Sequence, residues 1–214
     1  MSRNVRITVA LCVTFMVIVT GAFVLNVVRD PVLSVDQLRE QGTFILPEAR
    51  ALALRGLTAT SGQPFDESSM KGRWTFVFFG YTSCPDACPT TLAVLAQVER
   101  KLAEPRNAHL ADAFSVVLVS VDPERDDLSK LAQYVAVFSP RFVGVRGELD
   151  AVADFARQVN AAFMKVPGQG ESYLVDHTAN IVVIGPDARY RAFIRAPHDV
   201  DKIVLAYRSL AKAY

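Results

Sequence analysis

Two cysteines four positions apart, Cys84 and Cys88, are the side chains of this 214-residue chain whose types and spacing best suit chemistry. An apolar run over 75–79 precedes them, and a helical pattern begins after Pro89. Backbone N–H groups at a helix start stabilise negative charge, and we therefore expect a thiol there to have a lowered pKa. Because residues four apart lie on one helix face, the pair could close a disulfide after some adjustment or share one metal ion. The spacing thus predicts a redox pair or half of a metal site.

The composition narrows the classes of function. The formal net charge is +1, and charged residues of both signs are mixed along the chain. Since no basic stripe is present, we exclude a nucleic-acid-binding protein. Three cysteines are too few for a disulfide scaffold. The third, Cys12, lies in an apolar segment and is interpreted as a small buried hydrophobic residue.

The first 29 residues have the pattern of a membrane anchor. Residues 7–28 carry no charge and would span about 33 Å as a helix, enough for the hydrocarbon core. Arg3 and Arg6 precede them, which places the N-terminus in the cytoplasm and the rest of the chain outside. A cleaved signal peptide is the alternative, but its apolar region would be shorter, and residues 20–22 form a poor cleavage site. Because no leader of the transit-peptide type precedes the stretch, we expect a single-pass protein of the bacterial inner membrane, with its globular domain in the periplasm.

The remainder divides into a tether over 30–50, where charges are scattered, and a globular domain over 51–214. In the domain, buried strands alternate with amphipathic helices, the pattern of an α/β sheet covered on both faces. Thiols after the first central strand, and a final hairpin followed by a helix, indicate a thioredoxin-like fold with an added N-terminal hairpin, preceded by one transmembrane helix. The expected strands are 74–79, 114–121, 142–145, 181–184 and 190–194, the expected helices begin near 89, 127, 149 and 199, and an exposed loop covers 165–172.

A third group for the site comes from the three histidines. His177 follows the exposed loop and should emerge at the edge of the sheet where ligands of α/β folds bind. It could be a metal ligand or a catalytic residue, or an ordinary hydrogen-bonded histidine. His109 lies in a polar loop and is expected to face solvent. His198 precedes Asp199 at a helix start, where local capping explains it.

Acidic residues lie around the predicted site. Asp86, between the thiols, could tune their pKa values or contact a partner, but a solvated turn or cap residue is the simpler interpretation. Asp176 could orient His177 as a hydrogen-bond acceptor, or be an ordinary surface residue. A strand-ending turn and a helix cap explain most of the run 122–127, with docking of a partner as the alternative.

Several segments resemble the Sco/SenC copper chaperones of cytochrome oxidase assembly. The resemblance covers nearly everything after the anchor, and its most specific part is a long CPxxCP-like segment with one downstream Asp-His pair. The matching segments are Gly42-Thr43-Phe44, Pro47, Lys71-Gly72-Arg73-Trp74, FFGYTSCPDACPTTL, Val119–Asp126 and Val175–Thr178. The resemblance implies a thioredoxin-like fold in which two cysteines and one histidine bind a copper ion, here Cys84, Cys88 and His177.

The chemistry of this ligand set agrees with copper without selecting it. Thiolates and an imidazole suit Cu(I) and can hold Cu(II), but zinc also accepts two sulfurs and one nitrogen. Ser83 departs from the family, because many members carry histidine before the first cysteine. The three-ligand set stays intact, and the change bears on copper retention or partner contact.

These inferences predict a membrane-anchored periplasmic copper-binding protein that delivers copper to the binuclear copper-A centre of cytochrome c oxidase. Its partners would be the copper-A subunit and other periplasmic copper carriers or thiol reductants. The alternative is a thiol–disulfide reductase that uses Cys84 and Cys88 as a redox pair and keeps the recipient's cysteines reduced. A peroxidase of the peroxiredoxin type is disfavoured, because the segment around Thr82 does not form a PxxxTxxC motif.

Overall fold

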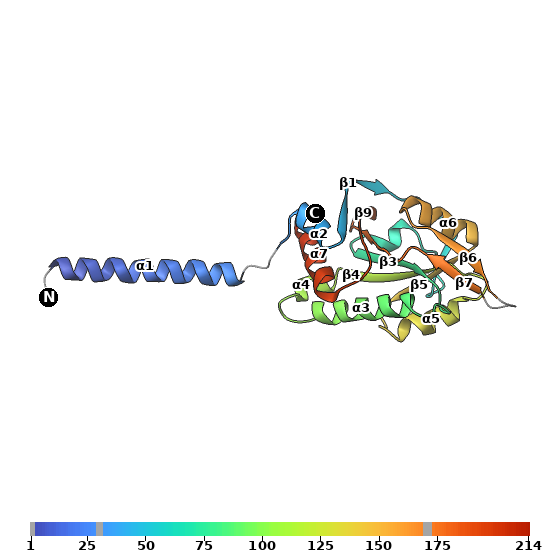
Figure 1. Ribbon diagram of the computed structural model, residues 1–214, viewed down its shortest axis with the longest axis horizontal. Coiled ribbons are helices and arrows are strands. Elements are labelled where there is room, and N and C mark those ends of the chain that lie inside the picture. The colour runs from blue at the N-terminus through green and yellow to red at the C-terminus, as the bar shows by residue number, and fades with distance from the viewer. Residues whose placement is uncertain (1–2, 29–31, 169–172) are drawn as a thin grey trace. The chain divides into compact units, whose positions relative to one another are not determined.

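The computed structural model describes residues 3–28, 32–168 and 173–214, leaving out the side chains of 3, 6, 24–28 and 167. The chain divides into two compact units, Met1–Val32 and Leu33–Tyr214. The first unit holds one helix, and the second holds both sheets and the other helices that the structure describes (Figure 1).

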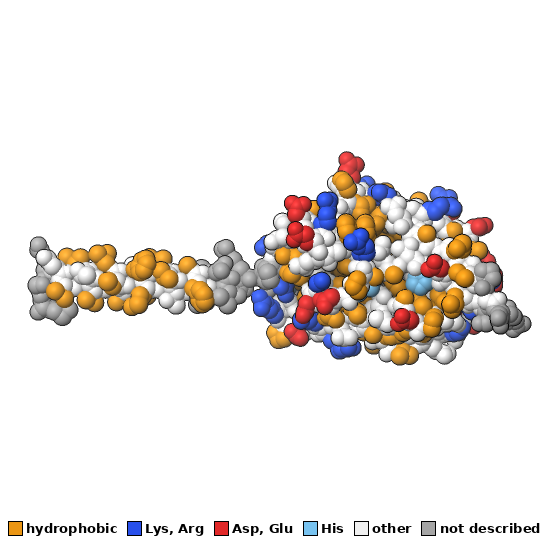
Figure 2. All heavy atoms as spheres, in the orientation of Figure 1, with side chains coloured by type: hydrophobic (Ala, Val, Ile, Leu, Met, Phe, Trp, Pro, Cys, Tyr) orange, Lys and Arg blue, Asp and Glu red, His pale blue; other side chains and the backbone are white. Residues whose placement is uncertain are grey.

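Helix α1 (Arg3–Val28) covers the uncharged stretch, which confirms that this stretch is helical. Figure 2 shows mainly hydrophobic side chains along it, whereas charged side chains are spread over the globular unit. Where side chains are described, which leaves out 3, 6 and 24–28 of this helix, no helix combines the length and the apolar character needed to cross a membrane. The transmembrane role is therefore not confirmed. Residues 29–31, where we expected the anchor to end, lie outside the described residues.

A seven-stranded mixed sheet organises the globular unit, with the strands in the order β1-β9-β8-β3-β4-β5-β2. Strands β3, β4 and β5 are parallel, whereas β8 pairs with β3, and β9 with β8, in the antiparallel sense. The α/β class and the central strands expected at 74–79 and 114–121 are confirmed. The strands are β1 (Thr43–Ala51), β2 (Leu57–Ala59), β3 (Trp74–Gly80), β4 (Phe114–Ser120), β5 (Val143–Gly147), β8 (Ile181–Ile184) and β9 (Arg189–Ile194).

Helices cover both faces of this sheet. Since side chains of β3 alternate between the faces, this strand contacts helices on both sides. Phe76 packs on Tyr207 of α7 with ring centroids 5.6 Å apart, and Phe79 packs on Phe155 of α6 at 5.2 Å. Every residue of β3 is buried, as its unbroken apolar run predicts. The helices of this unit are α2 (Val35–Glu40), the 3-10 helix η1 (Glu67–Met70), α3 (Ala87–Leu102), α4 (Ala108–Ala111), α5 (Leu128–Ala136), α6 (Leu149–Gln158) and α7 (Val200–Ala213).

The tether interpretation is wrong for residues 33–50, which belong to the globular unit. Ser34 caps α2 through a capping box, and Leu38 of that helix is only 2% exposed. Strand β1 follows and pairs with β9, with Thr43 opposite Ile194. These contacts make 33–51 part of the folded unit, because they supply an edge strand and one buried apolar anchor.

The added N-terminal hairpin is shorter than expected. Strand β2 pairs antiparallel with β5, and after a turn at Gly62 the chain returns through a single bridge between Thr58 and Pro64. Gly62 has φ +80°, a backbone conformation that favours glycine at this turn. The returning arm is therefore one bridge rather than a second strand.

A second, two-stranded sheet carries the histidine of interest. Strands β6 (Phe163–Pro167) and β7 (Tyr173–His177) pair with each other and with no strand of the main sheet that the structure describes. The loop expected over 165–172 is thus partly strand, and its residues 169–172 lie outside the described residues. We refer to β6 and β7 together as the β6–β7 hairpin.

Candidate metal centre

The structure brings the three predicted ligands together. Cys84 lies in the loop after β3, Cys88 lies in the first turn of α3, and His177 ends β7. Their ligand atoms all lie within 4.8 Å of one another. The Nε2 atom of His177 is 3.4 Å from Sγ of Cys88 and 4.0 Å from Sγ of Cys84. Two sulfurs and one nitrogen therefore face a single point, as a mononuclear site for a soft metal ion requires.

A glycine makes room for the inner sulfur. A Cβ added to Gly80, the last residue of β3, would lie 2.7 Å from Sγ of Cys88 and 3.1 Å from a methyl group of Leu118. The chain then turns, and the N–H of Cys84 donates to the carbonyl oxygen of Tyr81 over 3.2 Å. This turn places the sulfur of Cys84 where the N–H of Cys88 donates to it, at 3.5 Å.

The two thiols differ in exposure. Cys88 is fully buried, whereas Cys84 is half-buried, and both are free thiols in the described structure. An open cavity of about 390 Å³ leads to the site, and Cys84, Pro85, Leu174 and His177 are among the residues that line it. The half-buried sulfur and the imidazole thus face the opening, while Cys88 forms the back of the site.

Burial dominates the ionisation of the inner thiol. Burial raises the pKa of Cys88 far above its ordinary value, and the neighbouring Cys84 raises it further. The lowered pKa expected at a helix start is therefore wrong for Cys88, because the loss of solvation outweighs the favourable backbone dipoles. Cys88 is a neutral thiol in the empty site near neutral pH, and a metal ion must displace its proton to bind.

The imidazole is held as a neutral ligand. Phe78 and Tyr81 contact the His177 ring edge-on, with ring centroids 5.6 and 6.0 Å away. Burial lowers the pKa of His177, which favours the neutral ring. Its Nδ1 lies 3.4 Å from the carbonyl oxygen of Thr178, the contact that leaves the lone pair of Nε2 directed at the sulfurs. The orienting acceptor is thus a backbone carbonyl, while Asp176, the acceptor considered from the sequence, is exposed.

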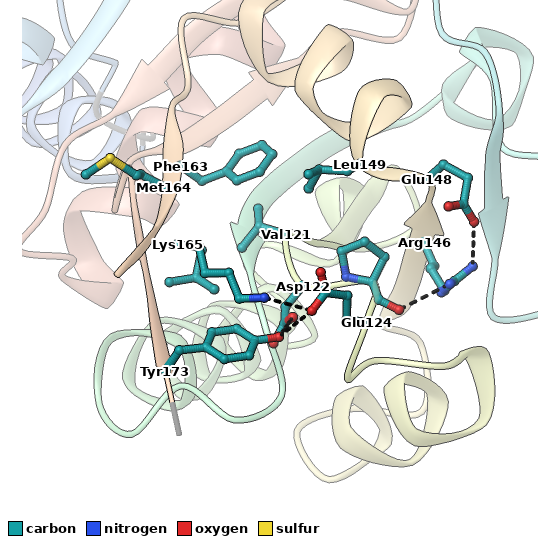
Figure 3. A pocket seen from close by; sticks show the side chains of 12 residues that line it. Val121, Asp122, Glu124, Arg146, Glu148, Leu149, Phe163, Met164, Lys165 and Tyr173 are labelled. Carbon is teal, nitrogen blue, oxygen red and sulfur yellow. Dashed lines mark hydrogen bonds and ion pairs between the residues drawn. The ribbon is translucent and has the colours of Figure 1, made fainter. Parts of the chain in front are cut away.

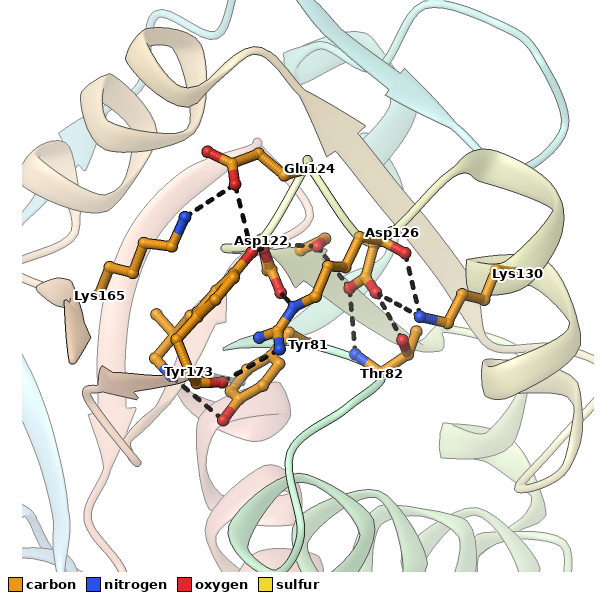
Figure 4. A network of polar contacts seen from close by, with 11 residues as sticks. Tyr81, Thr82, Asp122, Glu124, Asp126, Lys130, Lys165 and Tyr173 are labelled. Carbon is orange, nitrogen blue, oxygen red and sulfur yellow. Dashed lines mark hydrogen bonds and ion pairs between the residues drawn. The ribbon is translucent and has the colours of Figure 1, made fainter. Parts of the chain in front are cut away.

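Two acidic residues of the run 122–127, Asp122 and Asp126, are buried, whereas Glu124 and Asp127 are exposed. Asp126 is fully buried, and its carboxylate accepts hydrogen bonds from the N–H of Thr82 at 3.0 Å and the hydroxyl of Ser120 at 2.7 Å (Figure 4). Asp127 caps α5, accepting from the N–H of Lys130 at 2.7 Å, which confirms the predicted cap. Asp126 thereby fixes the loop that carries the thiols.

Of the remaining candidates, the two other histidines lie outside the site, whereas Asp86 lines the cavity beside Cys84 and His177. His109 is exposed, as expected. His198 does not cap α7: the side chain of Asp199 accepts from the N–H of Lys202, and Nε2 of His198 lies 2.9 Å from the carbonyl oxygen of Ala179. Asp86 is exposed at the start of α3 and makes no capping bond there, so a solvated turn residue describes it.

Sequence reasoning missed two residues that shape the site. Tyr81 packs on the imidazole, and its hydroxyl accepts from the N–H of Val175 at 3.2 Å, which ties β7 to the end of β3. Arg125 lies between the same two segments, 5.5 Å from the Tyr81 ring centroid. Tyr81 and Arg125 both lie in segments that match the family, and Arg125 lies in the run interpreted as a turn and cap, but neither pattern indicated a contact with the hairpin that carries His177.

Comparisons with known proteins extend over the globular unit. A family model described as SCO1/SenC matches residues 56–212. A Stutzerimonas stutzeri protein whose name refers to copper binding is 32% identical over 174 residues, 80% of this chain and 83% of that protein. The mitochondrial SCO1 homolog 1 of Arabidopsis thaliana is 32% identical over 160 residues, 73% of this chain and 47% of that protein, so the match spans about half of that relative's length. The structure of Bradyrhizobium japonicum ScoI with copper bound is 31% identical, with a TM-score of 0.63, and the match covers 73% of this chain and 98% of that one.

The unequal burial of the two thiols predicts unequal reactivity. In the reduced, metal-free protein at pH 8, we expect iodoacetamide to modify Cys84 at least about ten times faster than Cys88, because only the thiolate reacts and burial suppresses it at Cys88. Peptide mass spectrometry over time measures both rates, with the guanidinium-unfolded chain as the control in which the two rates converge. Equal rates in the folded protein would contradict this geometry.

Proposed function

Because the chain belongs to the SCO1/SenC family, we propose that it binds one copper ion through Cys84, Cys88 and His177. The observation that carries the proposal is the convergence of three ligand atoms within 4.8 Å of one another. Thiolates and a neutral imidazole suit Cu(I) and can also hold Cu(II). The copper-bound structure of a relative with this fold supports copper over zinc, which the ligand types leave open.

The open side of the site suits an ion that is passed on. Three protein ligands leave a coordination position free, and the cavity beside Cys84 and His177 gives a partner's ligand access to it. A partner can then bind the ion before the first ligands leave, which a closed four-ligand site resists. We propose copper as cargo, delivered to the copper-A subunit of cytochrome c oxidase, with other periplasmic copper carriers or thiol reductants as further partners. The family resemblance supports this recipient, and both thiols must be reduced before copper loads.

The proposed copper site predicts different effects for the substitutions His177→Ala and His109→Ala. The reduced protein should bind one copper ion, and His177→Ala should weaken Cu(II) binding by at least about tenfold and abolish the thiolate-to-copper absorption of the wild type. His109→Ala, which removes an exposed histidine far along the sequence, is the control and should change neither property. Competition titrations and absorption spectra make the measurement. Wild-type affinity and spectrum in His177→Ala would count against the proposed ligand set.

A thiol–disulfide reductase remains the second candidate, favoured by the unequal exposure of the two thiols. The thiolate of Cys84 would attack a disulfide of the recipient, releasing one recipient thiolate and forming a mixed disulfide. The thiolate of Cys88 would then attack Cys84, releasing the second recipient thiolate and leaving a Cys84–Cys88 disulfide. Two electrons pass to the recipient, and two protons follow them to its thiolates.

The dependence on His177 separates the two functions. A reductase needs both cysteines but not the imidazole, so His177→Ala should keep its yield of recipient thiols if reduction is the main activity. If copper delivery is the main activity, as we propose, the same variant should lose transfer of copper to the copper-A subunit. Counting free thiols and bound copper on an oxidised, then on a reduced, recipient distinguishes these results. If the wild type transfers no copper and His177→Ala still produces recipient thiols at the wild-type yield, the reductase is favoured.

We also propose that the globular unit lies in the periplasm, held at the inner membrane by the N-terminal segment. The uncharged stretch 7–28 and the basic residues before it support this placement. In spheroplasts of a bacterium that makes the full chain, a membrane-impermeant maleimide should label Cys84 without lysis. Labelling only after lysis would refute the placement.

A further inference from the structure

The β6–β7 hairpin is attached to the body of the globular unit by side chains rather than by strand pairing. Among the described strands, it forms a sheet of its own. A cavity of about 380 Å³ lies beneath it, and Figure 3 shows Phe163, Lys165 and Tyr173 of the hairpin facing Val121 and Glu124 of the body across that space. Val175 of β7 is buried in the core, and Phe163 and Tyr173 pack against that core, so apolar packing holds the hairpin in part. Polar contacts beside the cavity add to it at the start of β7.

Arg125 makes the central contact of this attachment. Its Nη1 donates to the backbone carbonyl oxygen of Tyr173, at the start of β7, over 3.0 Å. Its Nε pairs with the carboxylate of Asp122, at the end of β4. The guanidinium also lies 3.6 Å from the ring centroid of Tyr173 (Figure 4). One side chain thus bonds to the body and to the hairpin at the same time.

Neighbouring contacts reinforce the same attachment. The Tyr173 hydroxyl donates to the Asp122 carboxylate at 2.6 Å, and this carboxylate is only 3% exposed. Lys165 pairs with Glu124 at 2.7 Å and lies 3.8 Å from the Tyr173 ring centroid. Hydrogen bonds with an ionised partner are the stronger kind, and solvent screens those to the buried Asp122 less than it screens the exposed Lys165–Glu124 pair. Strand β7 is therefore fixed four residues before its metal-binding end.

The segment that holds the hairpin also holds the thiols. Arg125 bonds to the hairpin that carries His177, and the next residue, Asp126, bonds to the loop that carries Cys84 through Thr82. Adjacent residues of one turn thus set the positions of both halves of the metal centre. A displacement of β7 relative to this turn changes the distance between the imidazole and the sulfurs.

We propose that Arg125 is a positioning residue that holds β7 so that His177 stays at the two thiols, and that it thereby sets how long the site retains copper. The inference rests on the proposed function, because it assumes His177 as a copper ligand. Residues that orient a metal ligand commonly change metal affinity by about 10–100-fold when they are removed. Arg125 touches neither the ion nor a ligand atom and acts through the backbone of β7.

The test replaces Arg125 in the full chain and follows copper release. Arg125→Met should speed the loss of Cu(I) to the chelator bathocuproine disulfonate by about 10–100-fold, and should shift the absorption and electron paramagnetic resonance spectra of the Cu(II) form toward those of His177→Ala. Arg141→Met is the matched control, because Arg141 also pairs with a carboxylate, of Glu99, and donates to a backbone carbonyl, of Ala111. It should leave both readouts unchanged.

A double-mutant cycle shows whether Arg125 acts through the imidazole. Once His177 is alanine, adding Arg125→Met should cause no further acceleration of copper loss. Tyr173→Phe, which removes the hydroxyl bonds to Asp122 and Glu124 and keeps the ring, should give a smaller change in the same direction. It serves if Arg125→Met does not fold.

The outcomes separate this inference from the proposed function. If His177→Ala retains copper like the wild type, the ligand set and the inference both fail. If His177→Ala loses copper faster but Arg125→Met and Tyr173→Phe match the wild type, only the inference fails. An equal acceleration by Arg125→Met with and without His177 would also overturn it, because the residue would then act on the thiols.

Discussion

The metal centre depends on bringing one imidazole to two sulfurs that lie 93 and 89 positions earlier in the chain. The two thiols lie in the loop and the first helical turn that follow β3, a central strand of the main sheet. The imidazole ends a strand of a separate two-stranded sheet, which no described strand of the main sheet pairs with. The turn after β4 bonds to both segments, through Arg125 on one side and Asp126 on the other. The ligands therefore come together through tertiary contacts of that turn with both segments.

The same geometry accounts for the electrostatics of the empty site. Burial keeps Cys88 protonated near neutral pH and favours the neutral ring of His177. Copper then replaces a proton at the inner sulfur, and its own charge stabilises the thiolates. Cys84, which is half-buried at the cavity, is the sulfur that a partner reaches first. One buried sulfur and one accessible sulfur suit an ion that is first retained and then transferred to another protein.

Local patterns in the sequence predicted the parts that local forces determine. The apolar runs at 74–79 and 114–121 identified the central strands, and the thiol spacing identified half of the site. Prediction from the sequence failed where contacts between distant segments determine the structure. Strand β1 (43–51) has a single buried residue, and no local pattern reveals its pairing with β9. The helix start predicted a lowered pKa for Cys88, but burial raises it. Burial, too, depends on contacts with distant segments. The family resemblance selected His177 as the third ligand, and the structure places its Nε2 beside both sulfurs. Its spacing from the thiols contains no structural information by itself.

The most direct test of this account is the copper X-ray absorption spectrum of the reduced, copper-loaded full chain. The account predicts a coordination shell of two sulfurs and one imidazole nitrogen around a single copper ion. Replacing His177 with alanine should remove the scattering of the imidazole ring and leave the sulfurs in place. A wild-type spectrum with sulfur neighbours only, or with a second copper nearby, would contradict it.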